Sequence, residues 1–283
     1  MSNNRSKVRD AVLWAASFLT TKDVENGRLE AELLMAEAMG KDRAAILAGF
    51  ADLLPEAAWN QFFQLVNKRG QGFPLQYLTG RQDFMSLSFS VEEGVLIPRG
   101  DTEILVEAVL DLGITPENIL DIGTGSGIIA VCLAKYIPNS RITALDVSLR
   151  ALKLAAKNAE ALSVQDRIKF VQEDIFQWEP EEEYDLIISN PPYIPGSEIK
   201  SLQKEVQFEP PEALDGGEQG LDFYLRLAEL SPTSLKPLGI LAVEIGWQQA
   251  EEVENIFQAA GLKDIVVVQD YCGRDRVILC RKG

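Results

Sequence analysis

Ile119-Leu-Asp-Ile-Gly-Thr-Gly-Ser-Gly-Ile128 is the stretch that decides the fold. It starts as a short aliphatic strand, passes through three alternating glycines and continues into a helix. Alternating glycines let the chain turn sharply and let a ligand lie directly on the backbone. The strict dinucleotide-binding pattern, counted from Gly123, requires Gly or Ala at position 128 and finds Ile128. The loop therefore predicts a ligand site at a strand end without identifying the ligand.

Strands and helices alternate from this stretch to the end of the chain, as in a parallel sheet covered by helices. Strands are predicted at 118–122, 141–146, 167–172, 184–189, 238–245, 263–269 and 275–281. Helices are predicted at about 126–137, 148–162, 221–231 and 247–260. The last two strands are so close in sequence that they must pair antiparallel. The predicted fold is α/β, with a seven-stranded, mostly parallel, Rossmann-like sheet and an antiparallel C-terminal hairpin.

The N-terminal part reads as helical from residue 5 to residue 70, in four or five helices. Two apolar stripes support this reading: Val8, Val12, Ala15 and Leu19, then Leu29, Leu33, Leu34 and Ala38, with Gly40 ending the second helix. The segment that follows breaks the helical period and contains a β-hairpin, predicted to turn at Glu93-Gly94. We therefore expect a helical bundle at 1–72, a linker with a hairpin at 73–100, and the α/β domain at 101–283. Asp101 or Thr102 is expected to cap the helix that opens the last domain.

A second decisive stretch is Asp185-Leu-Ile-Ile-Ser-Asn-Pro-Pro-Tyr-Ile-Pro195. Three aliphatic residues predict a strand buried on both faces, and two prolines stop it because they donate no backbone hydrogen bond. The prolines stiffen a loop in which Asn190 can accept and donate hydrogen bonds and Tyr193 can stack on a flat group. This loop is suited to hold a planar, amide-like group.

Carboxylates follow the next two predicted strands. Asp146 ends a strand about twenty residues past the glycines, where an acid binds the two hydroxyls of a ribose, although it could instead cap the next helix. Asp174, beside Ile175 and Phe176, is placed to accept from the amino group of an adenine, with a cap or a solvated acid as the alternative. No Gly-Lys-Ser/Thr cradle or basic residue is present in the loop to bind phosphates. These features predict a nucleoside ligand without phosphates, and S-adenosylmethionine fits.

Composition narrows the class of protein. The 283 residues are 46% hydrophobic and 25% charged, as in a soluble globular protein, and the chain has neither an apolar run of membrane length nor a signal-peptide core. The three cysteines are not paired by spacing, so a cytoplasmic location with reduced thiols is expected. The absence of histidine excludes a histidine general base and a histidine metal site. The net charge of −16 falls entirely after residue 75, which disfavours direct nucleic-acid binding and favours a protein substrate.

The sequence closely resembles the peptide chain release factor glutamine methyltransferases, the HemK/PrmC family, over essentially its full length. Five motifs carry the resemblance: Asp-Ile-Gly-Thr-Gly-Ser-Gly (121–127), Asn-Pro-Pro-Tyr (190–193), Pro-Leu-Gln-Tyr-Leu-Thr-Gly (74–80), Ile-Pro-Arg-x-Asp-Thr-Glu (97–103) and Phe-Glu-Pro (208–210). The glycine loop marks only the S-adenosylmethionine-dependent superfamily, whereas the motifs at 74–103 are specific. One position departs from the family, because Gly100 stands where proline is usual.

The resemblance implies methyl transfer from S-adenosylmethionine, which leaves S-adenosylhomocysteine, to the glutamine nitrogen of the Gly-Gly-Gln loop of class-1 release factors. It assigns the cofactor to Gly123, Thr124, Gly125, Ser126, Gly127, Asp146, Asp174, Ile175 and Asn190. It assigns the substrate amide to Asn190, Pro191, Pro192 and Tyr193, with Asn190, Pro191 and Tyr193 as the catalytic group. It also implies that the helical bundle recognises the release factor. No metal, no membrane contact and a monomer are expected.

The loop chemistry agrees with this assignment. A carboxamide nitrogen is a poor nucleophile, and the Asn190 side-chain oxygen and the Pro191 carbonyl can accept its two N–H groups and aim the nitrogen at the methyl group. Three alternatives remain at this stage: an adenine-N6 or guanine-N2 nucleic-acid methyltransferase with the same loop, a nicotinamide-dependent oxidoreductase, and a non-catalytic binding protein. The roles of Arg99, Glu209 and Glu244 are not assigned by the sequence.

Overall fold

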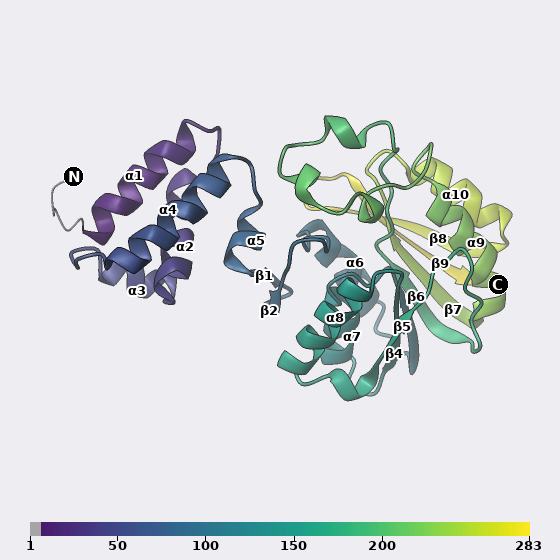
Figure 1. Cartoon of the computed structure of the whole chain (residues 1–283). Coiled ribbons are helices and arrows are strands. Elements are labelled where there is room, and N and C mark those ends of the chain that lie inside the picture. Colours follow the sequence, from purple (N-terminus) through teal and green to yellow (C-terminus); the bar gives the residue numbers. More distant parts are fainter. Residues whose placement is uncertain (1–6) are drawn as a thin grey trace. The chain divides into compact units, whose positions relative to one another are not determined.

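The computed structural model describes residues 7–283 and divides into two compact units (Figure 1). The first unit runs to Arg81 and also includes the short segment 203–208. The second unit comprises residues 82–202 and 209–283.

Among the described residues, the first unit contains five helices: four lie within the stretch predicted to be helical, and α5 lies in the segment that was predicted to be a linker. They are α1 (Val8–Thr20), α2 (Gly27–Met39), α3 (Arg43–Ala48), α4 (Glu56–Gly70) and α5 (Leu75–Thr79). All four residues of the stripe predicted on α1 are buried: Val8, Val12, Ala15 and Leu19. The stripe predicted for α2 is only partly right: Leu34 and Ala38 are buried, but Leu29 is 40% exposed. Gly40 ends α2 with a left-handed φ of 59°, a conformation that glycine adopts without steric cost.

A buried arginine fastens segment 203–208 to these helices. Arg69, at the end of α4, is 4% exposed and donates to both carboxylate oxygens of Glu30. Its Nη2 also donates to Glu205 at 2.6 Å. Beside this cluster, the ring of Phe208 packs edge-on against Phe73 with a centroid distance of 5.2 Å.

The second unit begins with a hairpin of β1 (Arg81–Phe84) and β2 (Leu87–Ser90). The predicted turn at Glu93-Gly94 is wrong, because the chain turns at Met85 and Ser86, which have φ of 49° and 59°. Two consecutive positive φ values define the tight turn that matches strand twist, and Met-Ser does not carry the usual Asn-Gly signal for it.

The large sheet has seven strands in the order β5-β4-β3-β6-β7-β9-β8, which confirms the predicted fold class. The strands are β3 (Asn118–Ile122), β4 (Arg141–Asp146), β5 (Ile168–Gln172), β6 (Tyr184–Ser189), β7 (Leu235–Glu244), β8 (Leu262–Gln269) and β9 (Asp275–Lys282). β3 to β7 pair parallel, and β9 pairs antiparallel with β7 and β8.

Helices cover both faces of this sheet (Figure 1). They are α6 (Asp101–Asp111), α7 (Ile128–Tyr136), α8 (Leu149–Ala161), α9 (Asp222–Ser234) and α10 (Ala250–Ala259). Neighbouring residues of β3 point to opposite faces of the sheet. Ile119 packs in the core with α6 and α7, and Leu120 packs in the core with α9 and α10. Strands buried on both faces explain the continuous aliphatic runs in the sequence.

The strand order reverses between β3 and β6, from which connections run toward opposite edges of the sheet. Open α/β sheets bind their ligands at such a switch point, outside the carboxyl ends of the strands. The glycine loop follows β3 and the Asn-Pro-Pro-Tyr loop follows β6, so the topology places both motifs at this point.

Candidate functional site

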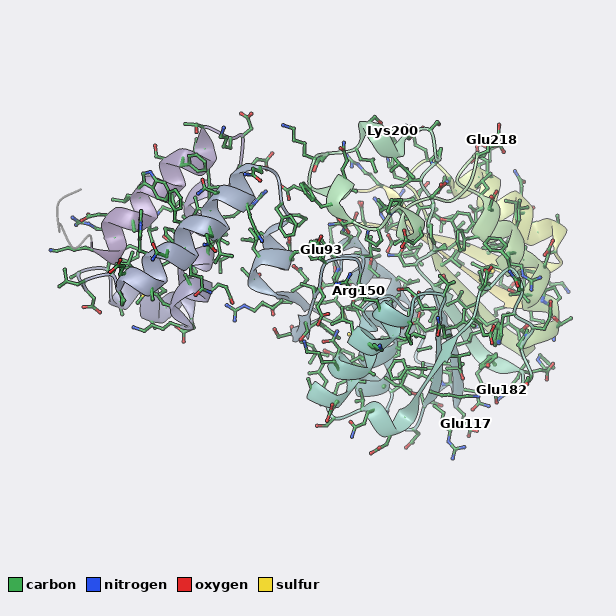
Figure 2. All side chains as sticks on the ribbon, in the orientation of Figure 1. Glu93, Glu117, Arg150, Glu182, Lys200 and Glu218 are labelled. Atoms are coloured by element: carbon green, nitrogen blue, oxygen red, sulfur yellow. The ribbon has the colours of Figure 1, made fainter. Side chains whose placement is uncertain are left out.

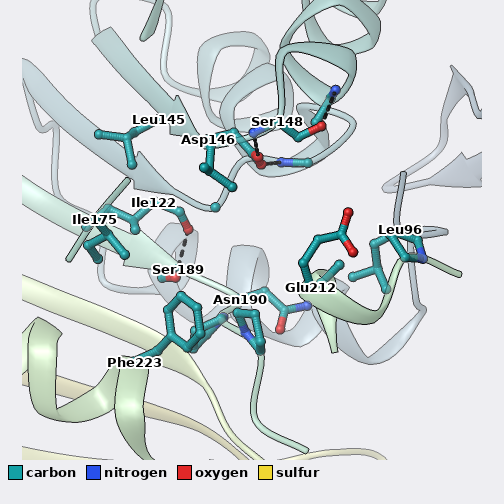
Figure 3. A pocket seen from close by; sticks show the side chains of 18 of the residues that line it. Leu96, Ile122, Leu145, Asp146, Ser148, Ile175, Ser189, Asn190, Glu212 and Phe223 are labelled. Atoms are coloured by element: carbon teal, nitrogen blue, oxygen red, sulfur yellow. Dashed lines mark hydrogen bonds between the residues drawn. The ribbon is translucent and has the colours of Figure 1, made fainter. Parts of the chain in front are cut away.

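A pocket occupies the switch point and is lined from several strand ends (Figure 3). Gly123 and Gly125 line it after β3, Asp146 after β4, and Asn190 after β6. Figure 3 shows Asp146 and Asn190 on opposite sides of the pocket. The walls are largely aliphatic, with Ile122, Leu145, Val147 and Ile175 among them.

The glycine loop leaves open space above its backbone. A Cβ built on Gly123 meets no atom within 4 Å, and one built on Gly125 meets only the Gly123 carbonyl at 4.0 Å. Gly127 differs, because a Cβ there would lie 2.8 Å from the Cβ of Ala155 on α8. The first two glycines therefore form a cradle that a ligand can fill, and the third permits close packing of α7 on α8.

A buried carboxylate lies beneath the loop. Asp121 is fully buried on β3, and its Oδ2 accepts from the Thr124 hydroxyl at 2.6 Å and from the Ala130 N–H at 3.2 Å. Its Oδ1 has no hydrogen-bond partner among residues 7–283. Burial raises the pKa of Asp121 to about 7. Asp121 does not line the pocket, but a buried carboxylate with one unsatisfied oxygen beneath the glycine loop favours a positively charged group bound above that loop.

Asp146 lies where the sequence predicts it and holds the loop in shape. Its Oδ2 accepts from the Gly125 N–H at 2.8 Å, and its Oδ1 accepts from the Ser148 N–H at 2.8 Å. Burial raises the pKa of Asp146, and these two hydrogen bonds oppose that shift. The alternative that Asp146 caps α8 is wrong, because Ser148 is the N-cap and accepts from Ala151 N–H. Asp146 is therefore free to present its remaining lone pairs to the pocket.

Asp174 and Ile175 line the pocket beyond β5. The Asp174 carboxylate accepts from the Phe176 N–H at 3.0 Å, which fixes the turn in which it lies. Ile175 is 5% exposed and packs in the core with Leu145 and Tyr224. An adenine could donate a hydrogen bond from its edge to Asp174 and pack its face on the apolar Ile175.

Asn190 projects from the end of β6 with its side chain fixed. Ser189, directly before it, donates from its hydroxyl to the Ile122 carbonyl at 2.8 Å, which ties the end of β6 to β3. The Asn190 Nδ2 donates to the Thr102 hydroxyl oxygen at 2.9 Å. Pro191 and Pro192 line the pocket beside it.

Four predicted site residues do not line the pocket: Thr124, Ser126, Gly127 and Tyr193. The Thr124 side chain is directed to Asp121, and the Ser126 carbonyl accepts from Asn158 Nδ2 at 2.8 Å. Tyr193 is partly buried and packs against the core on the side of α9 and α10, and its hydroxyl donates to Glu244 at 3.4 Å. Burial and the nearby Glu244 carboxylate raise the pKa of Tyr193 well above its ordinary value.

The structure adds pocket residues that the sequence reading missed. The segment 94–96 forms part of the wall, and a Cβ on Gly94 would lie 2.8 Å from the Arg150 guanidinium. Figure 2 labels Arg150 and Glu93, the residue before this segment. Pro210, Glu212 and Ala213 contribute from the loop after Asn-Pro-Pro-Tyr, and Phe223 from α9. Glu212 lies beside Asn190 in Figure 3. Only the Phe-Glu-Pro motif gave a signal near these positions.

An ion pair between Arg99 and Glu209 supports the loop that carries Glu212. Arg99 donates to the 3% exposed Glu209, whose Oε2 also accepts from the Ile97 N–H at 3.0 Å. Glu209 thus ties the Ile-Pro-Arg motif to the loop that carries Glu212. The predicted caps of α6 are wrong: Gly100 precedes the helix, no side chain caps it, and the Thr102 hydroxyl donates to Glu244 instead.

No group of three or more acidic or cysteine side chains within residues 7–283 is arranged to hold a metal ion. None of the helices in that same range is both long and apolar enough to cross a membrane.

Two family models match the chain, one in each part. The PrmC N-terminal domain matches residues 10–80, and the Methyltransferase small domain matches residues 99–218.

Curated relatives match over nearly the whole length. The release factor glutamine methyltransferase of Moorella thermoacetica is 43% identical, covering 96% of this chain and 97% of that protein. That of Geobacter sulfurreducens is 41% identical, covering 98% and 97%. A methyltransferase from Pyrococcus furiosus has a similar fold, with a TM-score of 0.53 at 19% identity, over 70% of this chain and 90% of that one.

Proposed function

Because the chain belongs to the release factor glutamine methyltransferase family, we propose that it transfers a methyl group from S-adenosylmethionine to the side-chain amide nitrogen of a release factor glutamine. The observation that carries the proposal is Asn190 on the pocket wall opposite Asp146, with Pro191 and Pro192 beside it. The finer part of the proposal is that the glutamine is that of the Gly-Gly-Gln loop of class-1 release factors.

The cofactor fits the residues of the pocket. The open cradle over Gly123 and Gly125 supports binding of its methionine end, and the unpaired Oδ1 of Asp121 lies below that cradle as a buried acceptor. Asp146 is proposed to bind the ribose hydroxyls, and Asp174 and Ile175 the adenine. Thr124, Ser126 and Gly127 are proposed to act on the cofactor only through the shape of the loop. The sulfonium of S-adenosylmethionine supplies an electrophilic methyl group.

The chain contributes orientation rather than a strong base. An amide nitrogen shares its lone pair with the carbonyl, and the chain has no histidine to remove a proton from it. The Asn190 Oδ1 and the Pro191 carbonyl are proposed to accept the two N–H groups of the substrate amide. Such acceptors fix the plane of the amide and stabilise positive charge that grows on its nitrogen. Positioning of this kind contributes up to roughly 7–11 kcal/mol.

Tyr193 is proposed to support the site from behind. The sequence suggested that its ring stacks on the substrate amide, but its hydroxyl donates to Glu244 and its partly buried ring packs against the core. It therefore holds the Asn-Pro-Pro backbone in place, together with Gln249, whose Nε2 donates to the Tyr193 carbonyl at 3.1 Å.

Residues 1–72 are proposed to recognise the release factor, with 73–100 as the linker and 101–283 as the methyltransferase domain. An aromatic cluster at the surface of α1 and α4 supports the recognition role. Trp14 is 37% exposed and stacks on Phe63, which is 42% exposed, at a centroid distance of 5.7 Å.

The test is transfer of a radiolabelled methyl group to a purified class-1 release factor. A variant of that factor with Ala in place of the Gly-Gly-Gln glutamine and a duplex DNA are incubated in parallel. Label in the unchanged factor alone is the expected result. Label in the alanine variant would refute the Gly-Gly-Gln assignment, and label in the DNA would favour the nucleic-acid alternative.

A further inference from the structure

A chain of hydrogen bonds runs from the pocket into the core of the second unit. The Asn190 Nδ2 donates to the Thr102 Oγ1 at 2.9 Å, and that hydroxyl donates to the Glu244 Oε2 at 2.7 Å. The three residues come from three elements: the loop after β6, the first turn of α6 and the last residue of β7. Thr102 and Glu244 are each 1% exposed and absent from the pocket lining.

The direction of these bonds follows from the chemistry of the groups. An ionised carboxylate only accepts hydrogen bonds, so the single proton of the Thr102 hydroxyl must point at Glu244. The Thr102 oxygen is then left with lone pairs toward Asn190, and only the Nδ2 end of the asparagine amide can donate to them. The Oδ1 end of Asn190 is consequently the end that remains for a ligand in the pocket.

We propose that Glu244, acting through Thr102, is a positioning residue that decides which end of the Asn190 amide faces the substrate. The inference rests on the proposed function, in which the Asn190 Oδ1 accepts an N–H group of the glutamine. A reversed asparagine would present two N–H groups to the N–H groups of the substrate, and the acceptor would be lost.

Polar and charged groups from α6, α9, β9 and the Asn-Pro-Pro-Tyr loop surround Glu244. Its Oε1 accepts from the Tyr193 hydroxyl at 3.4 Å, and its backbone carbonyl accepts from the Tyr224 hydroxyl at 3.0 Å. Arg276 on β9 attracts the carboxylate, while Asp101 at the start of α6 repels it. The Arg276 charge is shared, because its Nη2 lies 3.3 Å from Asp101 and 3.6 Å from a carboxylate oxygen of Asp270.

Protonation of Glu244 would allow these two hydrogen bonds of Thr102 to reverse their direction. A proton on Oε2 would be donated to the Thr102 oxygen, which frees the Thr102 proton to turn toward the Oδ1 of Asn190, so the amide is no longer restricted to its Nδ2 end. Burial of Glu244, the largest cause, raises its pKa to about 7, so both states are populated near neutral pH. Methyl transfer is therefore expected to be high above that pH and to fall as the pH drops through it.

The first experiment compares three variants of the full-length chain. Thr102→Val removes the hydroxyl but keeps the shape, and Thr102→Ser keeps the hydroxyl. Thr143→Val is the matched control, since Thr143 is a buried threonine on β4 that hydrogen-bonds to Tyr184 instead. We expect Thr102→Val to lower kcat roughly 10–100-fold, the range for a small misplacement of a reacting group, with the cofactor dissociation constant unchanged. Thr102→Ser and Thr143→Val should turn over close to the unchanged chain.

The second experiment follows pH. In the unchanged chain, kcat at saturating cofactor should show an acid limb near pH 7, and Glu244→Gln should remove that limb because glutamine does not titrate there. Asp121, whose pKa is also raised to about 7, contributes through the cofactor, so the cofactor dissociation constant is measured over the same pH range to separate the two groups.

A third readout does not depend on activity. The side-chain NH2 signals of Asn190, assigned with Asn190→Asp, are followed by NMR of the ¹⁵N-labelled chain across the same pH range. They should shift with an inflection near pH 7 in the unchanged chain and stay constant in Glu244→Gln.

The outcomes separate this inference from the proposed function. If the unchanged chain does not methylate a release factor, the proposed function fails, and the NMR titration alone decides whether Glu244 controls Asn190. If it does methylate one, a normal kcat in Thr102→Val overturns the inference. So does a Thr102→Ser variant as slow as Thr102→Val, or a Glu244→Gln variant that keeps the acid limb.

Discussion

The carboxylate of Asp146 accepts a hydrogen bond from the backbone N–H of Gly125 at 2.8 Å, so the end of β4 shapes the glycine loop that follows β3. The same carboxylate accepts from the Ser148 N–H, which sets the start of α8. One acid thus joins the three segments that form one side of the pocket. Its role is structural and, by our proposal, also ligand-binding.

Asp146→Ala should therefore weaken cofactor binding more than loss of ribose contacts alone would, because the loop also loses its anchor. We expect the cofactor dissociation constant to rise by a factor of ten or more, which corresponds to about 1.4 kcal/mol. Calorimetric titration with S-adenosylhomocysteine measures it. Asp146→Asn is the informative companion, since an amide oxygen can still accept from Gly125. Normal affinity in Asp146→Ala would show that the ribose partner is wrongly assigned.

Asn190→Ala should abolish measurable methyl transfer and leave most of the cofactor affinity. The alanine removes the proposed Oδ1 acceptor but leaves the glycine loop and Asp146 untouched. Single-turnover methylation of a release factor, with cofactor affinity measured on the same preparation, separates the two effects. Asn255→Ala on α10 is the control, because Asn255 lines a different surface pocket. Substantial turnover in Asn190→Ala is incompatible with our assignment.

Gly127 is expected to contribute to the stability of the protein, because it permits close packing of α7 on α8. Gly127→Ala places a Cβ 2.8 Å from Ala155 at a φ of 81°, and should destabilise the protein by about 1–3 kcal/mol. Gly261→Ala is the control for backbone strain alone, since its φ is 84° and its Cβ would meet no atom within 4 Å. Urea unfolding should rank Gly127→Ala as the less stable variant. Equal stabilities would mean that α7 moves away from α8 without cost.

Stability should decrease as the pH rises through the range in which Glu244 ionises. The ordinary pKa of the side chain is 4.5, and it is about 7 in the folded protein. Between these values the folded state binds more protons than the unfolded state, so the free energy of unfolding falls with pH. The loss from this group is on the order of 3 kcal/mol when complete. Urea unfolding near pH 5 and near pH 8 should show a smaller loss in Glu244→Gln than in the unchanged chain. An equal loss in both would place the titrating group elsewhere, with Asp121 the next candidate.

Arg69→Ala should destabilise the helical unit. The change leaves Glu30, which is 13% exposed, and Glu205, which is 44% exposed, without their partner, and we expect a cost of about 1–3 kcal/mol because solvent still reaches both carboxylates. Arg9→Ala is the control, because Arg9 and its partner Asp10 are 60% and 53% exposed, and such a surface ion pair is expected to contribute less than about 1 kcal/mol. Thermal unfolding followed by circular dichroism measures both. Similar midpoints for the two variants would contradict the role given to Arg69.

The strands of the large sheet could be predicted from local patterns in the sequence. β3, β4 and β6 have the predicted bounds to the residue, because aliphatic runs flanked by glycine, proline and acidic residues define a buried strand without reference to the rest of the chain. The sequence also placed Gly123, Gly125, Asp146, Asp174, Ile175 and Asn190 in one pocket, since the carboxyl ends of parallel strands meet at the same edge.

Only the tertiary structure decided how the polar groups are paired. Thr102, Asn190 and Glu244 are up to 142 positions apart, and the sequence gives no sign that their side chains form one chain of hydrogen bonds. Tyr193 was expected to stack on the substrate, and the sequence gives no sign that its hydroxyl donates to Glu244. The turn of the first hairpin was also misplaced, because positive φ at Met85 and Ser86 is imposed by strand pairing rather than by the residues themselves. The spacing of apolar residues within a segment shows which of its side chains become buried, so burial can be predicted from that segment alone. The hydrogen-bond partner of a polar side chain is decided only when segments far apart in the sequence pack together.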